Sequence, residues 1–171
     1  SGKVDVKGLT GKKSHTPAFI KKLFFELVDV LSEVQTMEDF VKAKKQISEK
    51  ISVCGKKLQA KEIPLEDLTF NVMLSKAPSE YTKTIPQHIR AAKQLEGIRE
   101  IKKGDKISFI KILNKPGVKP VELAKKDEID SKKYLEFLES TLEQITSSMD
   151  LDFDVMLGKP KQTGLDEFFW S

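Results

Sequence analysis

Apolar residues early in the chain recur with the period of an α-helix. In the stretch TPAFIKKLFFELVDVLSEV, apolar side chains return about every 3.6 residues, which places them on one face. Thr16 is suited to cap this helix, and Pro17 to occupy its first position. The predicted core-facing positions are Ile20, Leu23, Phe24, Leu27, Leu31 and Val34.

A second helical pattern follows in TMEDFVKAKKQISEKISVCGKKLQ. Thr36 is its predicted N-cap, and two acidic residues lie in its first turn. The apolar stripe is thinner here and consists of Phe40, Ala43, Ile47 and Ile51. We therefore predict a helix that is packed on one side only, against the first helix.

The middle of the chain changes from a helical to a strand pattern. Pro64 ends the helical run, and LTFNVML alternates apolar and polar side chains as a half-buried strand does. PQHIRAAKQLEG predicts a short helix that begins at Pro86 and ends at Gly97. A Gly104-Asp105 turn then precedes a second strand, predicted over residues 106–113. Its inward residues are predicted to be Ile107, Phe109 and Ile112.

A third long helix is predicted in DSKKYLEFLESTLEQITSS. Its apolar face consists of Leu135, Leu138, Leu142 and Ile145. Tyr134 and Phe137 are interpreted as exposed aromatic residues on this acidic helix. From Gly158 onward the pattern is lost, which predicts a flexible tail. The predicted fold class is α+β, a mainly helical domain with a small β element and a flexible C-terminal tail.

Composition limits the class of protein. A chain of 171 residues with 39% hydrophobic content is long enough for one domain with a core. It contains no apolar run of the roughly 20 residues that a membrane helix needs and no signal-peptide pattern, so we expect a soluble, cytoplasmic protein. Its one cysteine, Cys54, excludes an intrachain disulfide, and we interpret it as structural.

Charge is distributed unevenly along the chain. The net charge is +4, yet residues 1–22 carry six lysines against one acid, and residues 121–158 carry ten acids against four lysines. A basic end favours a polyanion as partner, whereas an acidic end repels one. Nucleic acid is one interpretation of the basic end, and a solvated surface is the other.

The last residues, KQTGLDEFFW, form an apolar cluster after a polar linker. Gln162, Leu165, Phe168 and Phe169 occupy relative positions 1, 4, 7 and 8, so one helical turn gathers the last three into an apolar plug. This string resembles the peptide by which replication proteins dock on the toroidal sliding clamp. The resemblance implies that the glutamine hydrogen-bonds beside the clamp pocket and that the apolar residues fill it. The alternative is that Phe168, Phe169 and Trp170 fold back onto the domain.

Two internal stretches carry a second resemblance. VDVKGLTGKKSHTP and SKAPSEYTKTIPQHIRAAKQLEGIREIKKGDKISFI are similar to the palm-to-thumb passage and the thumb of family B DNA polymerases, of the crenarchaeal replicative type. The resemblance divides the chain into a palm-thumb junction (1–15), a thumb domain (16–157) and a tail with the clamp-binding peptide (158–171). It implies a piece of a longer, archaeal, DNA-associated enzyme.

A thumb grips the primer-template duplex through phosphates, without reading sequence. The resemblance and the residue types imply DNA contacts from Lys7, Gly8, Lys12, Lys13, Lys76, Tyr81, Lys83, His88 and Arg90. Gly8 allows close approach of the backbone. For Tyr81 and His88, packing against the domain is an equal alternative to contact with DNA.

Catalysis is not expected from this chain. The family's reaction needs paired aspartates that hold two divalent metal ions, and no YGDTDS-like turn is present. We expect the two Mg²⁺ ions in the absent palm, and no cofactor in this stretch. MDLDFDV, with Asp150, Asp152 and Asp154, is interpreted as a solvated acidic run.

Two other classes of protein stay open. One is a non-catalytic replication or repair accessory protein with the same tail, and the other is an unrelated helical interaction domain. An accessory subunit docking on the aromatic residues of the acidic helix is a further hypothesis.

Overall fold

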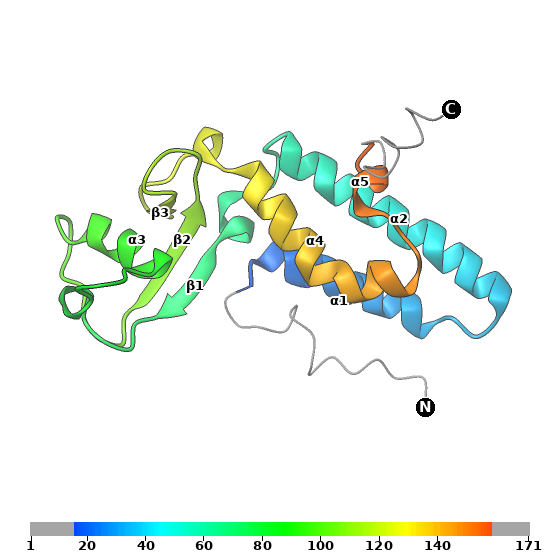
Figure 1. The fold of residues 1–171 in the computed structure, drawn as a ribbon, viewed down its shortest axis with the longest axis horizontal. Coiled ribbons are helices and arrows are strands. Elements are labelled where there is room, and N and C mark those ends of the chain that lie inside the picture. The colour runs from blue at the N-terminus through cyan, green and yellow to red at the C-terminus, as the bar shows by residue number, and fades with distance from the viewer. Residues whose placement is uncertain (1–15, 159–171) are drawn as a thin grey trace.

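The structure is a computed structural model that describes residues 16–158. The α-helices are α1 (Ala18–Ser32), α2 (Met37–Gln59), α3 (Gln87–Leu95), α4 (Ser131–Ser148) and α5 (Phe153–Met156). The strands are β1 (Phe70–Met73), β2 (Lys106–Lys111) and β3 (Val118–Pro120). Short 3₁₀ turns are η3 (Leu65–Leu68), η4 (Pro78–Glu80) and η5 (Lys126–Glu128). The longer helices α1, α2 and α4 lie at one end of an elongated molecule, and the small sheet with the short helix α3 lies at the other (Figure 1). The predicted α+β class is confirmed.

The three long helices share one core. α1 contacts both α2 and α4, and α2 contacts α4 and α5. The predicted core face of α1 is confirmed from Ile20 to Leu27, where Ile20, Phe24 and Leu27 are almost fully buried. Of the two later predicted positions, Leu31 is only partly buried and Val34 lies beyond the end of the helix. The prediction that α2 packs on one side only is wrong. Its thin stripe is widened by Gly55 and Leu58, which lie under α5 and near α4.

The starts of the two first helices differ in how they are capped. α1 begins at Ala18 with Pro17 in the cap position, so the predicted Thr16 cap is wrong by one residue. In α2, the backbone amide of Asp39 donates to the Thr36 hydroxyl at 3.0 Å, and the Thr36 amide donates to the Asp39 carboxylate at 3.2 Å. This capping box satisfies donors that a helix start leaves unpaired, and it confirms Thr36 as the N-cap.

The sheet is antiparallel with the order β1-β2-β3. Phe70 pairs with Phe109, and Met73 pairs with Lys106 at the start of β2. β2 is covered on both faces, since Ile107 and Phe109 on one face and Ile110 on the other are all buried. α3 packs against β2 and β3. β3 was not predicted, because a strand this short carries no readable alternation.

Tyr134 of α4 joins the helices to the sheet. Its ring lies 5.7 Å from that of Phe70 and 6.2 Å from that of Phe19 on α1. Phe137 meets Phe70 edge-on at 5.4 Å. Tyr134 has no exposed surface, and Phe137 is partly buried against the core, so the interpretation of both as exposed aromatic residues is wrong. The predicted apolar face of α4 is confirmed at Leu138, Leu142 and Ile145. Leu135 is only partly buried, and Tyr134 joins the buried face because the sheet covers it.

Candidate nucleic-acid interface

Several residues predicted to bind partners fall outside the described part of the chain. They are Lys7, Gly8, Lys12 and Lys13 at the start, and Gln162, Leu165, Phe168 and Phe169 at the end. Their roles stay predictions. The remaining five, Lys76, Tyr81, Lys83, His88 and Arg90, all lie in or beside the sheet end of the molecule.

Lys76 and Tyr81 are held together after β1. The chain turns through η4, where the Glu80 carboxylate accepts a hydrogen bond of 2.8 Å from the Ala77 amide. This turn brings Tyr81 back over Lys76, whose ammonium nitrogen lies 4.5 Å from the centre of the ring. The Tyr81 hydroxyl is 3.4 Å from the hydroxyl of Ser75. A cation held on an aromatic face is positioned without being neutralised, so Lys76 keeps its charge for an anion.

Tyr81 also meets His88 at the start of α3. The two rings are 6.4 Å apart and nearly perpendicular. Exposed Lys83 lies on the loop whose ends these rings hold together. Partial burial lowers the pKa of the His88 imidazole. His88 is therefore neutral at physiological pH, and it offers a hydrogen-bond donor and a packing surface in place of a positive charge.

A second basic segment, not singled out from the sequence, adjoins Lys76. The Gly104 amide donates to the Leu74 carbonyl at 2.8 Å, and the Leu74 amide donates to the Asp105 carbonyl at 2.8 Å. Gly104 has a φ of +90°, which permits the tight turn. The turn carries the exposed side chains of Lys102, Lys103 and Lys106. The spacing of lysines around the predicted Gly-Asp turn was the sequence signal for this segment.

We call the combined region the tip surface. It consists of Lys76, Tyr81, Lys83, His88, Lys102, Lys103 and Lys106. The ion pair between Lys102 and Glu100, 3.9 Å with both side chains mostly exposed, is too weak to remove that positive charge. The tip surface thus carries five lysines on or beside two hydrogen-bonded turns, against the acids Glu80, Glu100 and Asp105, of which Glu80 and Asp105 accept hydrogen bonds from backbone amides.

Arg90 does not join the tip surface. Its guanidinium Nη1 donates to the Pro116 carbonyl at 3.3 Å, in the turn between β2 and β3. That turn follows β2, whereas the Lys102–Lys106 turn precedes it. The Arg90 side chain is engaged in supporting the sheet, and Gln94 on the same helix donates to the Val118 carbonyl at 2.9 Å.

Two aspartates in the last third of the chain, Asp152 and Asp130, cap helices. Asp152 caps α5, since its carboxylate accepts from the Val155 amide at 3.2 Å. Asp130 caps α4 in the same way through the Lys133 amide. Among residues 16–158, no three side chains of His, Cys, Asp or Glu come together as metal ligands would. The expectation of Mg²⁺ in the palm stays a prediction.

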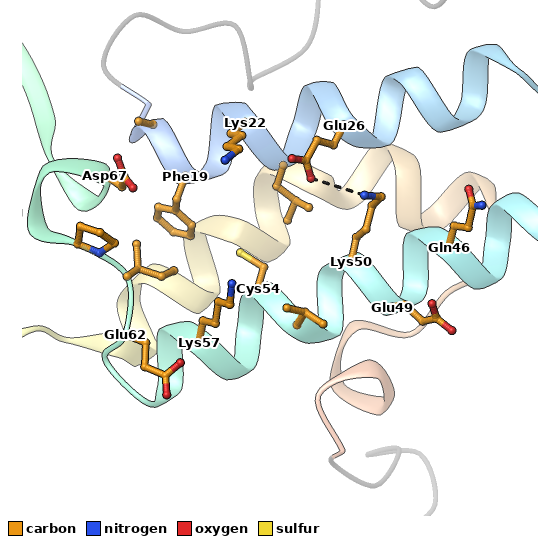
Figure 2. A pocket seen from close by; sticks show the side chains of 15 residues that line it. Phe19, Lys22, Glu26, Gln46, Glu49, Lys50, Cys54, Lys57, Glu62 and Asp67 are labelled. Atoms are coloured by element: carbon orange, nitrogen blue, oxygen red, sulfur yellow. Dashed lines mark ion pairs between the residues drawn. The ribbon is translucent and has the colours of Figure 1, made fainter.

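An open groove of about 1030 Å³ lies between α1 and α2, away from the tip surface (Figure 2). Phe19, Leu23 and Ile63 supply apolar walls, and Cys54 lines the groove from α2. Burial raises the pKa of the Cys54 thiol to about 11, so it is a weak nucleophile at neutral pH. We refer to this feature as the α1–α2 groove.

Comparison with known proteins identifies the family. The family model described as DNA polymerase family B matches residues 1–150. The chain belongs to this family. It is 40% identical to DNA polymerase 1 of Sulfolobus acidocaldarius over 172 residues, which is 99% of this chain and 19% of that protein. It is 34% identical to DNA polymerase 1 of Aeropyrum pernix over 161 residues, covering 94% of this chain and 17% of that protein.

A solved structure shares the fold. The family B DNA polymerase from the hyperthermophilic archaeon Pyrobaculum calidifontis aligns with a TM-score of 0.62 at 17% identity, over 76% of this chain and 17% of that chain. The family B chain described here therefore spans less than a fifth of its curated relatives. The resemblance to crenarchaeal-type family B polymerases is confirmed. Within residues 16–158, no helix is both long and apolar enough to span a bilayer.

Proposed function

We propose that this chain is the thumb of a DNA-directed DNA polymerase and that its tip surface grips primer-template duplex by the phosphate backbone. The observation that carries the proposal is the convergence of Lys76 with the turn of Lys102, Lys103 and Lys106. These lysines come from separate stretches of sequence, whose backbones are joined by the hydrogen bonds between Leu74 and the Gly104 turn.

The chemistry of the tip surface suits phosphates better than bases. Lysine ammonium groups on turns are point charges without the planar fork that reads guanine edges. Lys76 is steadied by the Tyr81 ring, and neutral His88 can donate to a phosphate or sugar oxygen. Contacts of this kind position a duplex in register with the active site while any sequence passes through.

The antiparallel pairing of β1 with β2 gives this grip its rigidity. Phe70 and Phe109 are paired across the strands with stacked rings 5.4 Å apart. Phe70 in turn packs on Tyr134 of α4, so the turns bearing the lysines are connected to the helical core. A load applied by the duplex at the tip would thus be resisted by the whole described domain. Membership of family B favours this function over the alternatives of a free-standing accessory protein or an unrelated helical domain.

Catalysis belongs, in this proposal, to other parts of the intact polymerase. The two metal ions and their aspartates would lie in the palm, and this chain would contribute binding energy and orientation alone.

The second element of the proposal is the tether to the sliding clamp. Gln162, Leu165, Phe168 and Phe169 would dock on the sliding clamp, which keeps the enzyme near its template at high effective concentration. An accessory subunit is a further partner that this function would accommodate.

The direct test of the grip is duplex binding by this chain, followed by fluorescence anisotropy with a labelled primer-template. We expect sequence-independent binding whose logarithmic affinity falls linearly with the logarithm of salt concentration, by about 0.9 per phosphate neutralised. Binding that is insensitive to salt, or restricted to one sequence, would contradict the proposal. Supplying the chain together with the rest of the polymerase extends the range of affinities that can be measured.

A further inference from the structure

The α1–α2 groove is an unexplained feature of the surface. Its floor is apolar, yet both of its sides carry charges, and Figure 2 shows Cys54 pointing from α2 into the space before α1. Val53, which also lines the groove, is 52% exposed. Phe19 and Ile63 are 7% exposed and Leu23 is 5% exposed, so Val53 is the most exposed large apolar side chain of the groove. A groove with such a residue fits the apolar side chains of a short docked segment.

We propose that the occupant of the α1–α2 groove is the chain's own C-terminal segment, Leu165 to Trp170, whenever that segment is not bound to another protein. The proposal assigns two states to one peptide, docked on its own domain or released to the clamp. The docking itself does not depend on the proposed function. Its effect on clamp binding rests on the proposed function above.

The place where the described chain ends supports this occupant. Leu157, the residue after α5, packs against Gly55 of α2, at a point where an added methyl group would collide with it. Gly55 is the neighbour of Cys54, which lines the groove. The segment after Leu157 therefore starts within one helical turn of the groove along α2. From Gly158 to Leu165, an extended chain reaches about 23 Å at ~3.3 Å per residue. This reach exceeds the diameter of about 10–12 Å that α2 presents.

The groove is lined by charges of both signs, Lys22, Lys50 and Lys57 with Glu26, Glu49, Glu62 and Asp67. Lys22 on α1 and Lys57 on α2 flank the groove (Figure 2), and within the described residues neither forms an ion pair. Lys50 is already paired with Glu26 at 3.8 Å. The C-terminal segment carries Asp166 and Glu167 between its apolar residues. Docking would place aromatic side chains over the apolar residues, and the two acids would have to face Lys22 and Lys57 and stay clear of Glu49, Glu62 and Asp67, so the position of the chain end carries the choice of occupant.

Tethering makes a weak contact sufficient. At an effective concentration of about 1 mM and an intrinsic Kd of about 0.1 mM, the docked form is favoured about tenfold. The clamp would have to compete with this state, which lowers its apparent affinity for the peptide by the same factor. The groove would therefore shelter the apolar plug from nonspecific contacts until the clamp displaces it.

Two residues of the chain report on the docking without an added label. Trp170 is its only tryptophan, and Cys54 is its only cysteine. The experiment measures the rate at which a disulfide reagent modifies Cys54 at pH 8.5, in the whole chain and in the F168A/F169A variant. We expect about a tenfold faster reaction in the variant, in line with the protection expected from a tethered segment. Equal rates would overturn the proposal, and the groove would then belong to another segment of the polymerase or to a partner.

Matched substitutions on α2 locate the docking site. Val53 lines the groove, and Val41, 63% exposed on the same helix, does not. We expect V53E to shift the Trp170 emission to that of a free peptide of residues 159–171, and V41E to leave it unchanged. If both variants or neither shift it, the groove assignment is wrong. Protection of Cys54 that grows with protein concentration would assign the groove to the tail of a second copy and overturn the intramolecular docking.

A titration with clamp tests the docking in the groove separately from the proposed binding of the tail to the clamp. V53E should bind clamp about tenfold more tightly than V41E, because no docked state competes. If V53E releases Trp170 but neither variant binds clamp, the docking is supported and the clamp proposal fails. If both variants bind clamp equally while Trp170 emission is that of the free peptide in the unsubstituted chain, the clamp proposal is supported and the docking fails.

Discussion

The hydroxyl of Tyr134 donates a hydrogen bond of 2.7 Å to the backbone carbonyl of Leu68. The same oxygen accepts one of 3.0 Å from the backbone amide of Lys111. One side chain of α4 thereby satisfies two buried backbone groups, one before β1 and one at the end of β2. Burial raises the pKa of the Tyr134 hydroxyl well above its ordinary value, so it stays protonated and can donate.

Replacing Tyr134 with Phe should lower the free energy of unfolding by about 1–3 kcal/mol, because the Leu68 carbonyl and the Lys111 amide lose their partner inside the protein. Chemical denaturation measures this. The matched control is Y81F, which removes a hydroxyl whose contact with Ser75 is 3.4 Å long and exposed. Y81F should leave the stability unchanged within experimental error. Equal effects of the two changes would contradict the role assigned to Tyr134.

The capping box of α2 predicts both a mutational and a pH effect. T36A should cost about 1 kcal/mol of stability, typical of a lost N-cap. Hydrogen bonds from the amides of Gln35 and Thr36 lower the pKa of the Asp39 carboxyl from its ordinary 3.8. A lowered pKa in the folded state means that this contribution is complete above the ordinary pKa and is lost as pH falls through the folded value.

The comparison that isolates this effect is denaturation of the wild-type chain and the D39N variant between pH 6 and pH 2. We expect the difference in stability to be largest at pH 6 and to shrink below the ordinary carboxyl pKa. A difference that stays constant over this range would show that the Asp39 charge does not stabilise the helix start.

Cys54 should react slowly and with a steep pH dependence. With its pKa raised to about 11, the thiolate fraction still increases about tenfold per unit between pH 8 and pH 10. Alkylation by iodoacetamide in the F168A/F169A variant measures this without the proposed tail contact. After unfolding in denaturant, the rate should level off nearer the ordinary thiol pKa of about 8.5. A plateau below pH 10 in the folded protein would contradict burial as the cause.

The C-terminal peptide has a test that leaves the fold untouched. Changing Phe168 and Phe169 together to Ala should abolish clamp binding in calorimetry, because the apolar plug is lost. The thermal unfolding midpoint should change little. W170A, outside the predicted motif, is the matched control and should retain most of the affinity for the clamp. If W170A lost affinity for the clamp and the double variant did not, the motif would have been assigned to the wrong residues.

The long helices could be predicted from sequence because each carries its own signal. The apolar repeat from Ile20 to Leu27 and the cap at Thr36 depend on neighbours along the chain. The predictions that failed concern residues whose environment is set by contacts with distant parts of the chain. Tyr134 is buried by a sheet that lies elsewhere in the sequence, and Gly55 packs under Leu157 because α5 returns to α2. β3 is too short to show a period, and its place was fixed by pairing with β2.

The candidate site divides in the same way. Lys76, Tyr81, Lys83 and His88 were found because a family resemblance marks their stretch, and the structure brings them into one region. Arg90 was predicted on the same resemblance and its positive charge, yet its side chain hydrogen-bonds to the Pro116 carbonyl in the turn after β2. Lys102, Lys103 and Lys106 were missed, since their nearness to Lys76 follows from backbone pairing between Leu74 and the Gly104 turn.

The measurement that tests the central claim most directly is the salt dependence of duplex binding for two charge-matched variants. One replaces Lys102, Lys103 and Lys106 with Ala, and the other replaces Lys42, Lys45 and Lys56 on α2, so both lose the same charge. We predict that the slope of log affinity against log salt becomes shallower by up to about 2.7 for the tip variant, and stays unchanged for the α2 variant. Equal slopes for the two variants would contradict a grip at the tip surface.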